Sequence, residues 1–221
     1  ASIQGVYIGA DGTPAGAVAA LSTTTGKSES PAVAGNSNGV AAVAWILNAS
    51  GVMPGPIPIP VVQNDVYVRL FDGAGTALTD GILVNDTGHV AYAPDVAVYE
   101  SGQMAVVWLD QRAQEFVNHV YCQFYTSDGT AVGTNFRVDT SDASCAHARC
   151  AVSADGALMI TWQNTVTHEV VSRVVYNDGS FAGCVVEHNH YPADSVRAYP
   201  AVGAGELGAL GRGGRGAARA R

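Results

Sequence analysis

Short runs of β-branched and aromatic residues alternate with turn-forming residues along most of the chain. Val40–Ile46 and Tyr67–Phe71 are two such runs, and the polar segments Asn36–Gly39 and Asp72–Gly75 adjoin them. β-branched and aromatic side chains favour strands, whereas Asn, Asp and Gly supply the backbone geometry of tight hairpin turns. No stretch has the periodicity of an amphipathic helix. The pattern therefore predicts an all-β protein made of short hairpins.

The hydrophobic pattern repeats at long, fixed offsets. Each of the three tryptophans follows one glycine by 33 residues and a second glycine by six, and the first glycine recurs a fourth time. Offsets kept through several copies are the signature of a repeat architecture. The repeat residues to which we assign a structural role are Trp45, Trp108, Trp162, Gly12, Gly75, Gly129 and Gly179.

Each copy predicts four short strands, and four-stranded units at this spacing are typical of β-propeller blades. The tryptophan is then expected to fill the space between neighbouring blades. Pairing the last hairpin of the chain with the first would close a four-bladed ring without free sheet edges. The alternative is a fragment of a larger propeller. We expect blades at 31–85, 94–139 and 148–187, and a fourth formed by 199–221 together with 5–21.

The fourth copy departs from the repeat partway through. Pro200 and Gly208 match the pattern, but Gly214 stands where the tryptophan should be, and residues 211–221 are only Gly, Ala and Arg. Such a segment cannot supply an apolar strand, and Arg inside a blade would be an unpaired buried charge. We therefore predict one propeller domain over 1–210, with repeats at about 5–47, 64–110, 118–164 and 170–210, and a tail at 211–221 that does not fit.

The second copy contains VVWLDQR at residues 106–112 and VYCQFYTSDG at residues 120–129. These segments resemble the repeats of secreted bacterial β-propeller-like proteins, which read VVWxDxR, VYxQRFDxxG and PxVAxxxDGxxVVxW. The resemblance spans residues 5 to about 210. It implies a propeller-like domain of an exported or surface protein, with no single activity attached.

The charged residues exclude some classes of partner. Four of the eleven basic residues fall in the last eleven positions, so the other 210 residues carry seven basic and 19 acidic side chains, a formal charge of −12. Nucleic-acid binding needs clustered Lys and Arg, so a nucleic-acid partner is not expected. No apolar run approaches the ~18 residues of a membrane span, so membrane insertion is not expected either. Abundant Thr, Ser, Asn and Gly favour a secreted or cell-surface location.

The cysteines bear on the compartment. Cys122, Cys145, Cys150 and Cys184 allow three pairings, which the sequence does not separate. In an oxidising compartment we expect at least one disulfide, the alternative being buried thiols that pack as small apolar side chains. Cys145 and Cys150 lack the CxxC spacing of a zinc site, and no cofactor is predicted.

Candidate binding residues lie where predicted strands end. Asp110 and Arg112 follow the second tryptophan at a position suited to a blade end. They can form either an inter-blade salt bridge or a site for a sugar or a carboxylate. The pair is not repeated, because Leu47 stands at the position of Asp110 in the first copy and Asn164 in the third. Asn164 is included among the candidate binding residues.

The sequence Glu187-His188-Asn189-His190 is the densest group of histidines in the chain. His188 and His190 would lie on one face of a strand, where two imidazoles can bind a ligand or a transition metal. Solvated loop residues are the alternative interpretation. We name Glu187, His188 and His190 as candidate binding residues and assign no metal.

These observations predict a non-catalytic exported binding or scaffold domain that contacts a glycan or a protein through loops at the blade ends. One alternative is a carbohydrate-active hydrolase with Asp110 and either Glu169 or Glu187 as carboxylates, since that chemistry needs two carboxylates facing one sugar. The other is a structural unit of a surface assembly. No catalytic residue is assigned.

Overall fold

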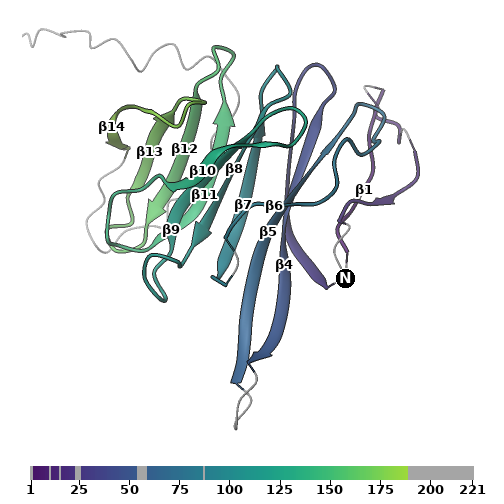
Figure 1. Ribbon diagram of the computed structural model, residues 1–221. Helices are drawn as coiled ribbons and strands as arrows, with labels where there is room; N and C mark the ends of the chain where they lie inside the picture. The colour runs from purple at the N-terminus through teal and green to yellow at the C-terminus, as the bar shows by residue number, and fades with distance from the viewer. Residues whose placement is uncertain are drawn as a thin grey trace, which may run out of the picture.

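The computed structural model describes residues 2–9, 11–14, 16–22, 26–53, 59–86 and 88–188, and only the backbone of 49–53 and 59–63. In this part of the chain, fourteen strands form three four-stranded antiparallel sheets and one two-stranded sheet (Figure 1). It contains no helix that is long and apolar enough to cross a membrane. The predicted all-β class is confirmed.

Consecutive strands of each sheet pair as antiparallel neighbours. The N-terminal pair is β1 (Gln4–Gly5) and β2 (Ala19–Ala20). The first four-stranded sheet contains β3 (Lys27–Gly35), β4 (Ala41–Met53), β5 (Ile59–Phe71) and β6 (Ile82–Leu83). The second contains β7 (Ala91–Val98), β8 (Met104–Asp110), β9 (His119–Tyr125) and β10 (Ala131–Arg137). The third contains β11 (Cys145–Val152), β12 (Leu158–Asn164), β13 (Val170–Val175) and β14 (Phe181–Glu187).

The three sheets begin and end within a few residues of the predicted units at 31–85, 94–139 and 148–187. Packed four-stranded sheets are therefore the part of the propeller prediction that the structure supports. Closure of the ring is not shown, because residues 199–221, with the fourth copy and the tail, lie outside the described residues. The closed propeller stays a prediction.

The sheets pack face to face, and alternate residues of one strand pack on opposite sides of the sheet. Met104, Val106 and Trp108 of β8 belong to the core between the first and second sheets. Val107 and Leu109 of the same strand belong to the core between the second and third sheets. A strand that is buried on both faces needs a continuous apolar run, which explains the sequence of β8.

Each tryptophan packs toward the element that precedes its own sheet. Trp45 shares a core with Ile3 of the N-terminal hairpin, and Trp108 lies between the first and second sheets. Trp162 lies between the second and third sheets. All three indoles are buried, and Trp108 stacks on Tyr121 with ring centroids 6.0 Å apart. The repeat glycines Gly12, Gly75, Gly129 and Gly179 all have positive φ, from 79° to 85°, at hairpin turns.

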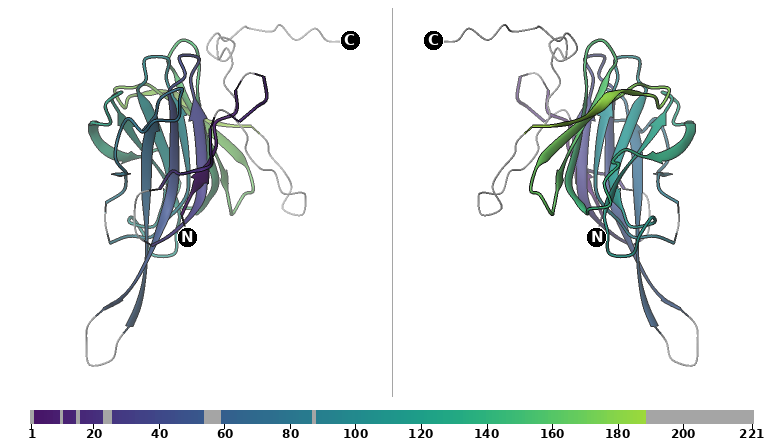
Figure 2. Two further views of the ribbon diagram at one scale, coloured as in Figure 1. Left: turned by 90° about the vertical axis from the view of Figure 1, so that its right-hand side faces the viewer. Right: turned by 90° about the vertical axis from the view of Figure 1, so that its left-hand side faces the viewer.

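The hairpin of β4 and β5 is longer than its counterparts in the other sheets. Its pairing runs from Ala41 opposite Phe71 to Met53 opposite Ile59. The far end of this hairpin projects from the body of the molecule (Figures 1 and 2). The Pro-rich sequence GVMPGPIPIP at residues 51–60 thus begins as a continuation of this β-ribbon, and residues 54–58 lie outside the described residues.

The expectation of a disulfide is wrong for this structure, because all four cysteines are free thiols. Cys122 and Cys150 pack as small apolar side chains in the core between the second and third sheets. Cys145 is buried as well, and Cys184 is exposed on β14. The alternative interpretation, thiols that serve as small hydrophobic side chains, holds for the three buried residues.

Candidate functional site

The first strands of the three sheets, β3, β7 and β11, line a groove. β7 contacts β3 on one side and β11 on the other. The groove has a volume of about 710 Å³ and continues into a second hollow of about 430 Å³. Both hollows are lined by Val33, Asp95 and Arg149. We call them together the inner-strand groove, and its size suits a small ligand.

Each of the three first strands β3, β7 and β11 has a β-bulge at the same position of the repeat. Ser30, Ala93 and His147 have φ values of 53°, 44° and 55°, and the pairing register with the next strand shifts beside each of them. Residues with a Cβ rarely adopt such values, so each bulge holds local backbone strain. A β-bulge re-aims the side chains that follow it. Asp95 and Arg149 stand two residues after the second and third bulges and line the groove.

Asp95 and Arg149 place opposite charges on neighbouring strands. Asp95 Oδ2 accepts a hydrogen bond from the backbone N–H of Cys150 at 2.8 Å, which links the second sheet to the third. Burial raises the pKa of Asp95, although the hydrogen bond from Cys150 and the charge of Arg149 act in the opposite direction. Arg149 is exposed and donates to the Ala148 carbonyl at 2.7 Å. A carboxylate acceptor and guanidinium donors in one groove can bind hydroxyl groups.

Glu100 also lines the groove, but it is bound to the turn of the first sheet. Ser37 Oγ donates to Glu100 Oε2 at 2.7 Å, and Asn38 Nδ2 donates to the backbone carbonyl of Glu100 at 2.8 Å. Asn36 Nδ2 likewise donates to the Tyr99 carbonyl at 2.8 Å. These contacts fasten the β3–β4 turn to the β7–β8 turn, so the Glu100 carboxylate holds two sheets together.

The predicted pair Asp110 and Arg112 forms an ion pair at the end of β8. Asp110 is fully buried, and its Oδ2 accepts from Trp108 Nε1 at 2.8 Å and from Arg112 Nη2 at 2.6 Å. Its Oδ1 accepts from the backbone N–H of Arg112 at 2.8 Å. Both carboxylate oxygens are thus bound within the second sheet. A ligand at Asp110 would have to displace a protein donor.

Arg112 extends this network to the first sheet. Its Nη1 pairs with Asp86, which follows β6, and donates to Asn135 Oδ1 at 2.6 Å. The guanidinium lies over Tyr121, 4.4 Å from the ring centroid. Burial lowers the pKa of Arg112, but the carboxylates Asp110 and Asp86 outweigh it and leave the pKa raised. The structure thus contains an inter-sheet salt bridge here, and ligand binding by the pair stays a prediction.

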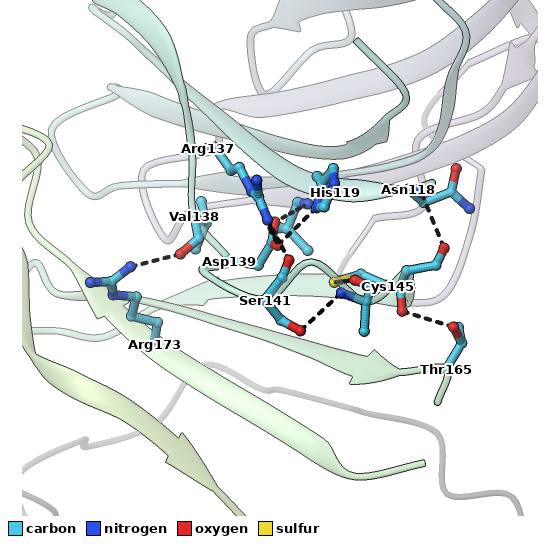
Figure 3. Close-up of polar contacts among 12 residues, drawn as sticks. Asn118, His119, Arg137, Val138, Asp139, Ser141, Cys145, Thr165 and Arg173 are labelled. Carbon is cyan, nitrogen blue, oxygen red and sulfur yellow. Dashed lines mark hydrogen bonds and ion pairs between the residues drawn. The ribbon is translucent and has the colours of Figure 1, made fainter. Parts of the chain in front are cut away.

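Sequence reasoning missed a second buried polar cluster, at the start of β9 (Figure 3). His119 Nδ1 lies 3.0 Å from Asp139 Oδ2, and Asp139 Oδ1 accepts from the Val120 N–H at 2.7 Å. Arg137 Nη2 donates to Asp139 Oδ2 at 2.8 Å and also to the Ser141 carbonyl. His119 and Asp139 are almost fully buried. The cluster ties the connection between the second and third sheets to β9.

The repeat carried a signal for this cluster. His119, the first residue of β9, stands at the repeat position that Asp65 and Glu169 occupy in the other two copies. All three side chains are buried. Three polar residues at one position of an apolar repeat would have marked this end of the sheets as a polar layer.

Cys145 lies beside the cluster but is not an activated nucleophile. Burial raises the pKa of the Cys145 thiol to about 12, with a smaller contribution from the charge of Asp139. A nucleophilic cysteine needs a lowered pKa, so the site does not support cysteine-based catalysis. Within the described ranges, no group of three or more His, Cys, Asp or Glu is placed to hold a metal ion.

Of the remaining predicted residues, Asn164 binds within its own loop, and Glu187 and His188 lie at the end of β14. Asn164 Oδ1 accepts from the N–H groups of Val166 and Thr167, so this side chain shapes the turn after β12. Glu187 is exposed at the end of β14, and His188 Nε2 lies 2.6 Å from Ser172 Oγ on β13. His190 lies outside the described residues.

No protein-family model and no curated protein sequence matches the chain. Among solved structures, a glycosyl hydrolase from Bacteroides ovatus is similar to it, with 12% sequence identity and a TM-score of 0.38. The similarity covers 71% of this chain and 51% of the hydrolase, so the chain spans about half the length of that protein. At this level the similarity assigns neither a family nor an activity.

Proposed function

We propose that the chain is a non-catalytic binding domain that holds a hydroxyl-rich ligand of the saccharide class in the inner-strand groove. The observation that carries the proposal is the pair Asp95 and Arg149, which follows equivalent bulges on neighbouring strands. The carboxylate accepts hydrogen bonds and the guanidinium donates them, so together they can bind adjacent hydroxyls of a sugar ring. Export to the cell surface, expected from the composition, belongs to the same proposal.

Apolar side chains supply the rest of the groove. Val33 of β3 is 73% exposed, and Ala151 and Val152 of β11 are partly exposed in the lining. Small-molecule sites typically combine an apolar lining with a few placed polar groups. The aliphatic surface suits the C–H faces of a sugar, and the charged pair fixes its orientation. The contact is thereby assigned to the inner strands rather than to the blade-end loops.

Binding is favoured over hydrolysis by the positions of the carboxylates. Glycoside hydrolysis needs two carboxylates that face one sugar from opposite sides. Of the carboxylates that line the groove, Glu100 is bound to Ser37, which leaves Asp95 beside Arg149. Asp110, the carboxylate expected for a hydrolase, is fully buried with both oxygens bound. The hydrolase alternative is therefore not proposed.

A glycan array of the purified chain, followed by calorimetric titration of the best soluble oligosaccharide, tests the proposal. We expect Asp95→Asn and Arg149→Gln each to weaken binding by about tenfold or more, which is the loss of one strong charge-assisted contact. Asp128→Asn is the matched control, since Asp128 is an exposed turn carboxylate that does not line the groove.

Three results would overturn the proposal. One is an array on which no glycan binds. Another is glycan binding that Asp95→Asn and Arg149→Gln leave unchanged, which would place the ligand elsewhere. The third is release of reducing sugar at a rate that Asp95→Asn abolishes, which would make the domain an enzyme.

A further inference from the structure

Within the part of the chain that the structure describes, the hairpin of β1 and β2 leaves one strand edge unpaired. Among the described residues, β1 pairs with β2 alone. Leu21 N–H donates to the Ile3 carbonyl at 2.8 Å, so the backbone polar groups of Ile3 point toward β2. Backbone groups of successive residues point to opposite edges, so those of Gln4 and Val6 point away from β2. An edge of this kind can pair with an added strand.

An apolar groove of about 380 Å³ lies along this edge. Residues 3–8 form its hairpin side, and residues 31–33 with Ala41, Val43 and Phe71 form its floor on the first sheet. The groove continues the core in which Trp45 packs with Ile3. Val6 and Ile8 beside it are 40% and 57% exposed. We call this feature the hairpin groove; it meets the inner-strand groove at residues 31–33 of β3, which line both.

The repeat identifies which element would occupy the hairpin groove. At the offset of 63 residues, Ile8 corresponds to Phe71 of β5 and Ala19 to Ile82 of β6. β1 and β2 are therefore the third and fourth strands of a unit. In each four-stranded sheet, the third strand pairs with a second strand, which carries the tryptophan. The open edge of β1 is the place of such a second strand.

The residues of this chain that the repeat would assign to the second strand beside β1 do not suit that position. At the offset that relates Pro94 to Pro200, the positions of Ala105, Val107 and Leu109 in β8 correspond to Gly211, Gly213 and Arg215. In β8 these three residues fill the core toward the next sheet. Glycine would leave the hairpin groove empty, and Arg would bring an unpaired charge onto an apolar floor.

We infer that the hairpin groove accepts an extended strand from a polypeptide different from this chain, paired antiparallel with β1. The three second strands of this chain describe the partner: an extended segment of at least seven residues that is largely apolar on both faces, with an aromatic fifth residue. In such strand addition, backbone hydrogen bonds provide affinity and side-chain pockets provide specificity. The floor at Ala41 and Val43 would take its small apolar side chains.

A peptide with the sequence of residues 103–110, flanked by lysines for solubility, is a suitable probe because it carries the β8 pattern. Fluorescence anisotropy measures its binding to the full chain, and a scrambled peptide is the specificity control. Hydrogen exchange of the Gln4 and Val6 amides maps the contact. We expect saturable binding of the ordered sequence and slower exchange of both amides when the peptide is present.

Proline variants test the edge itself. Val6→Pro removes a backbone donor from the open edge, and we expect it to weaken peptide binding by about tenfold or more. Ala20→Pro is the matched control on the other edge of the same hairpin. Ala20 lies opposite Gln4, and its backbone N–H points away from β1. It should leave peptide binding unchanged.

The inference is wrong if the ordered peptide binds no better than the scrambled one, or if the two proline variants lose binding equally. Slow exchange of Gln4 and Val6 in the free protein would also overturn it, because a second copy or residues 199–221 would then occupy the edge already. The exchange measurement needs no variant, so it decides the question even if Val6→Pro fails to fold.

Discussion

Asn85 and Asp139 occupy the same position of the repeat, 54 residues apart, and accept from equivalent backbone donors of their sheets. Asn85 Oδ1 accepts from the Val66 N–H, and Asp139 Oδ1 accepts from the Val120 N–H, each at 2.7 Å. Both side chains are buried. The second copy adds a charge to this cap, and Arg137 pairs with that charge. The first and second sheets each contain this hydrogen bond, whereas the ion pair with Arg137 belongs to the second sheet.

This relationship separates the cap from the charge. We expect Asp139→Asn to lower the free energy of unfolding by about 1–3 kcal/mol, because the amide can still accept from Val120 but no longer pairs with Arg137. Asp139→Ala should lower it by about 1 kcal/mol more, since the backbone donor is then unsatisfied as well. Urea denaturation of the three proteins measures both differences.

Asn85→Ala is the matched control, because Asn85 makes the same cap without a charge. We expect a loss of about 1–2 kcal/mol for this variant. If Asp139→Asn were as stable as the native chain, the buried ion pair with Arg137 would contribute nothing to the free energy of unfolding. The backbone hydrogen bond alone would then account for the stabilisation that the two sheets have in common.

Arg112 should matter more to stability than its charge alone suggests. It binds Asp86, Asp110 and Asn135 and covers the Tyr121 ring. Lysine cannot reproduce the planar, branched donor arrangement, so we expect Arg112→Lys to lower the free energy of unfolding by about 1–3 kcal/mol. The variant keeps the positive charge, and thermal denaturation at two salt concentrations measures its effect.

Lys27 provides the comparison for that prediction. Its ammonium lies 2.6 Å from Glu29 Oε2, and the two side chains are 66% and 36% exposed. Exposed pairs contribute little, so Lys27→Met should change the free energy of unfolding by less than about 0.5 kcal/mol. Equal effects of the two substitutions would mean that the inter-sheet bridge at Arg112 is no stronger than a surface ion pair.

The sequence was sufficient to predict the three four-stranded sheets, because the repeat and the strand pattern agree. Trp45, Trp108 and Trp162 recur at one offset, and each is a large buried side chain between packed elements. A side chain of that size leaves few alternatives to the core. The disulfide expectation failed because composition reports a compartment only indirectly, whereas pairing depends on where Cys122 and Cys150 lie in the core.

The candidate site was only partly predictable, for a physical reason. Asp110 and Arg112 are two residues apart, so their ion pair could be anticipated from the sequence. His119 and Asp139 are 20 residues apart and meet only because β9 and β10 pair. The bulges at Ser30, Ala93 and His147 left no sequence signal, since none of the three is a glycine. The position of Asp95 in the groove depends on those bulges.

The free thiols give a direct chemical prediction. Cys184 is exposed, and Cys122, Cys145 and Cys150 are buried. Burial raises the pKa of the three buried thiols, which suppresses the reactive thiolate. We therefore expect Ellman's reagent to modify one thiol rapidly in the native protein and all four in denaturant. Cys184→Ser should abolish the rapid reaction, and fewer than four thiols in denaturant without reductant would reveal a disulfide.

Asp95 predicts an unusual dependence of stability on pH. Burial raises its pKa in the folded state above the ordinary value of 3.8. The folded protein then binds this proton more tightly than the unfolded chain, so the contribution of Asp95 to stability falls as pH rises from 3.8 through the folded pKa. Asn cannot ionise. Asp95→Asn should therefore gain stability relative to the native chain as pH rises, with the gain constant above the folded pKa.

Asp128 supplies a control of opposite sign for the same experiment. The hydrogen bond from Thr126, together with those from Thr130, lowers the pKa of Asp128 in the folded state. Its contribution is present above the unfolded pKa and is lost as pH falls through the folded pKa, so Asp128→Asn should be less stable than the native chain at neutral pH and equal to it in acid. Melting temperatures over roughly pH 3 to 7, the range that spans ordinary and raised carboxyl pKa values, measure both variants. If Asp95→Asn followed the same trend as Asp128→Asn, Arg149 and Cys150 would stabilise the charged form of the Asp95 carboxylate. The groove would then contain a carboxylate whose charge the protein already compensates, rather than one that can accept hydrogen bonds from a ligand.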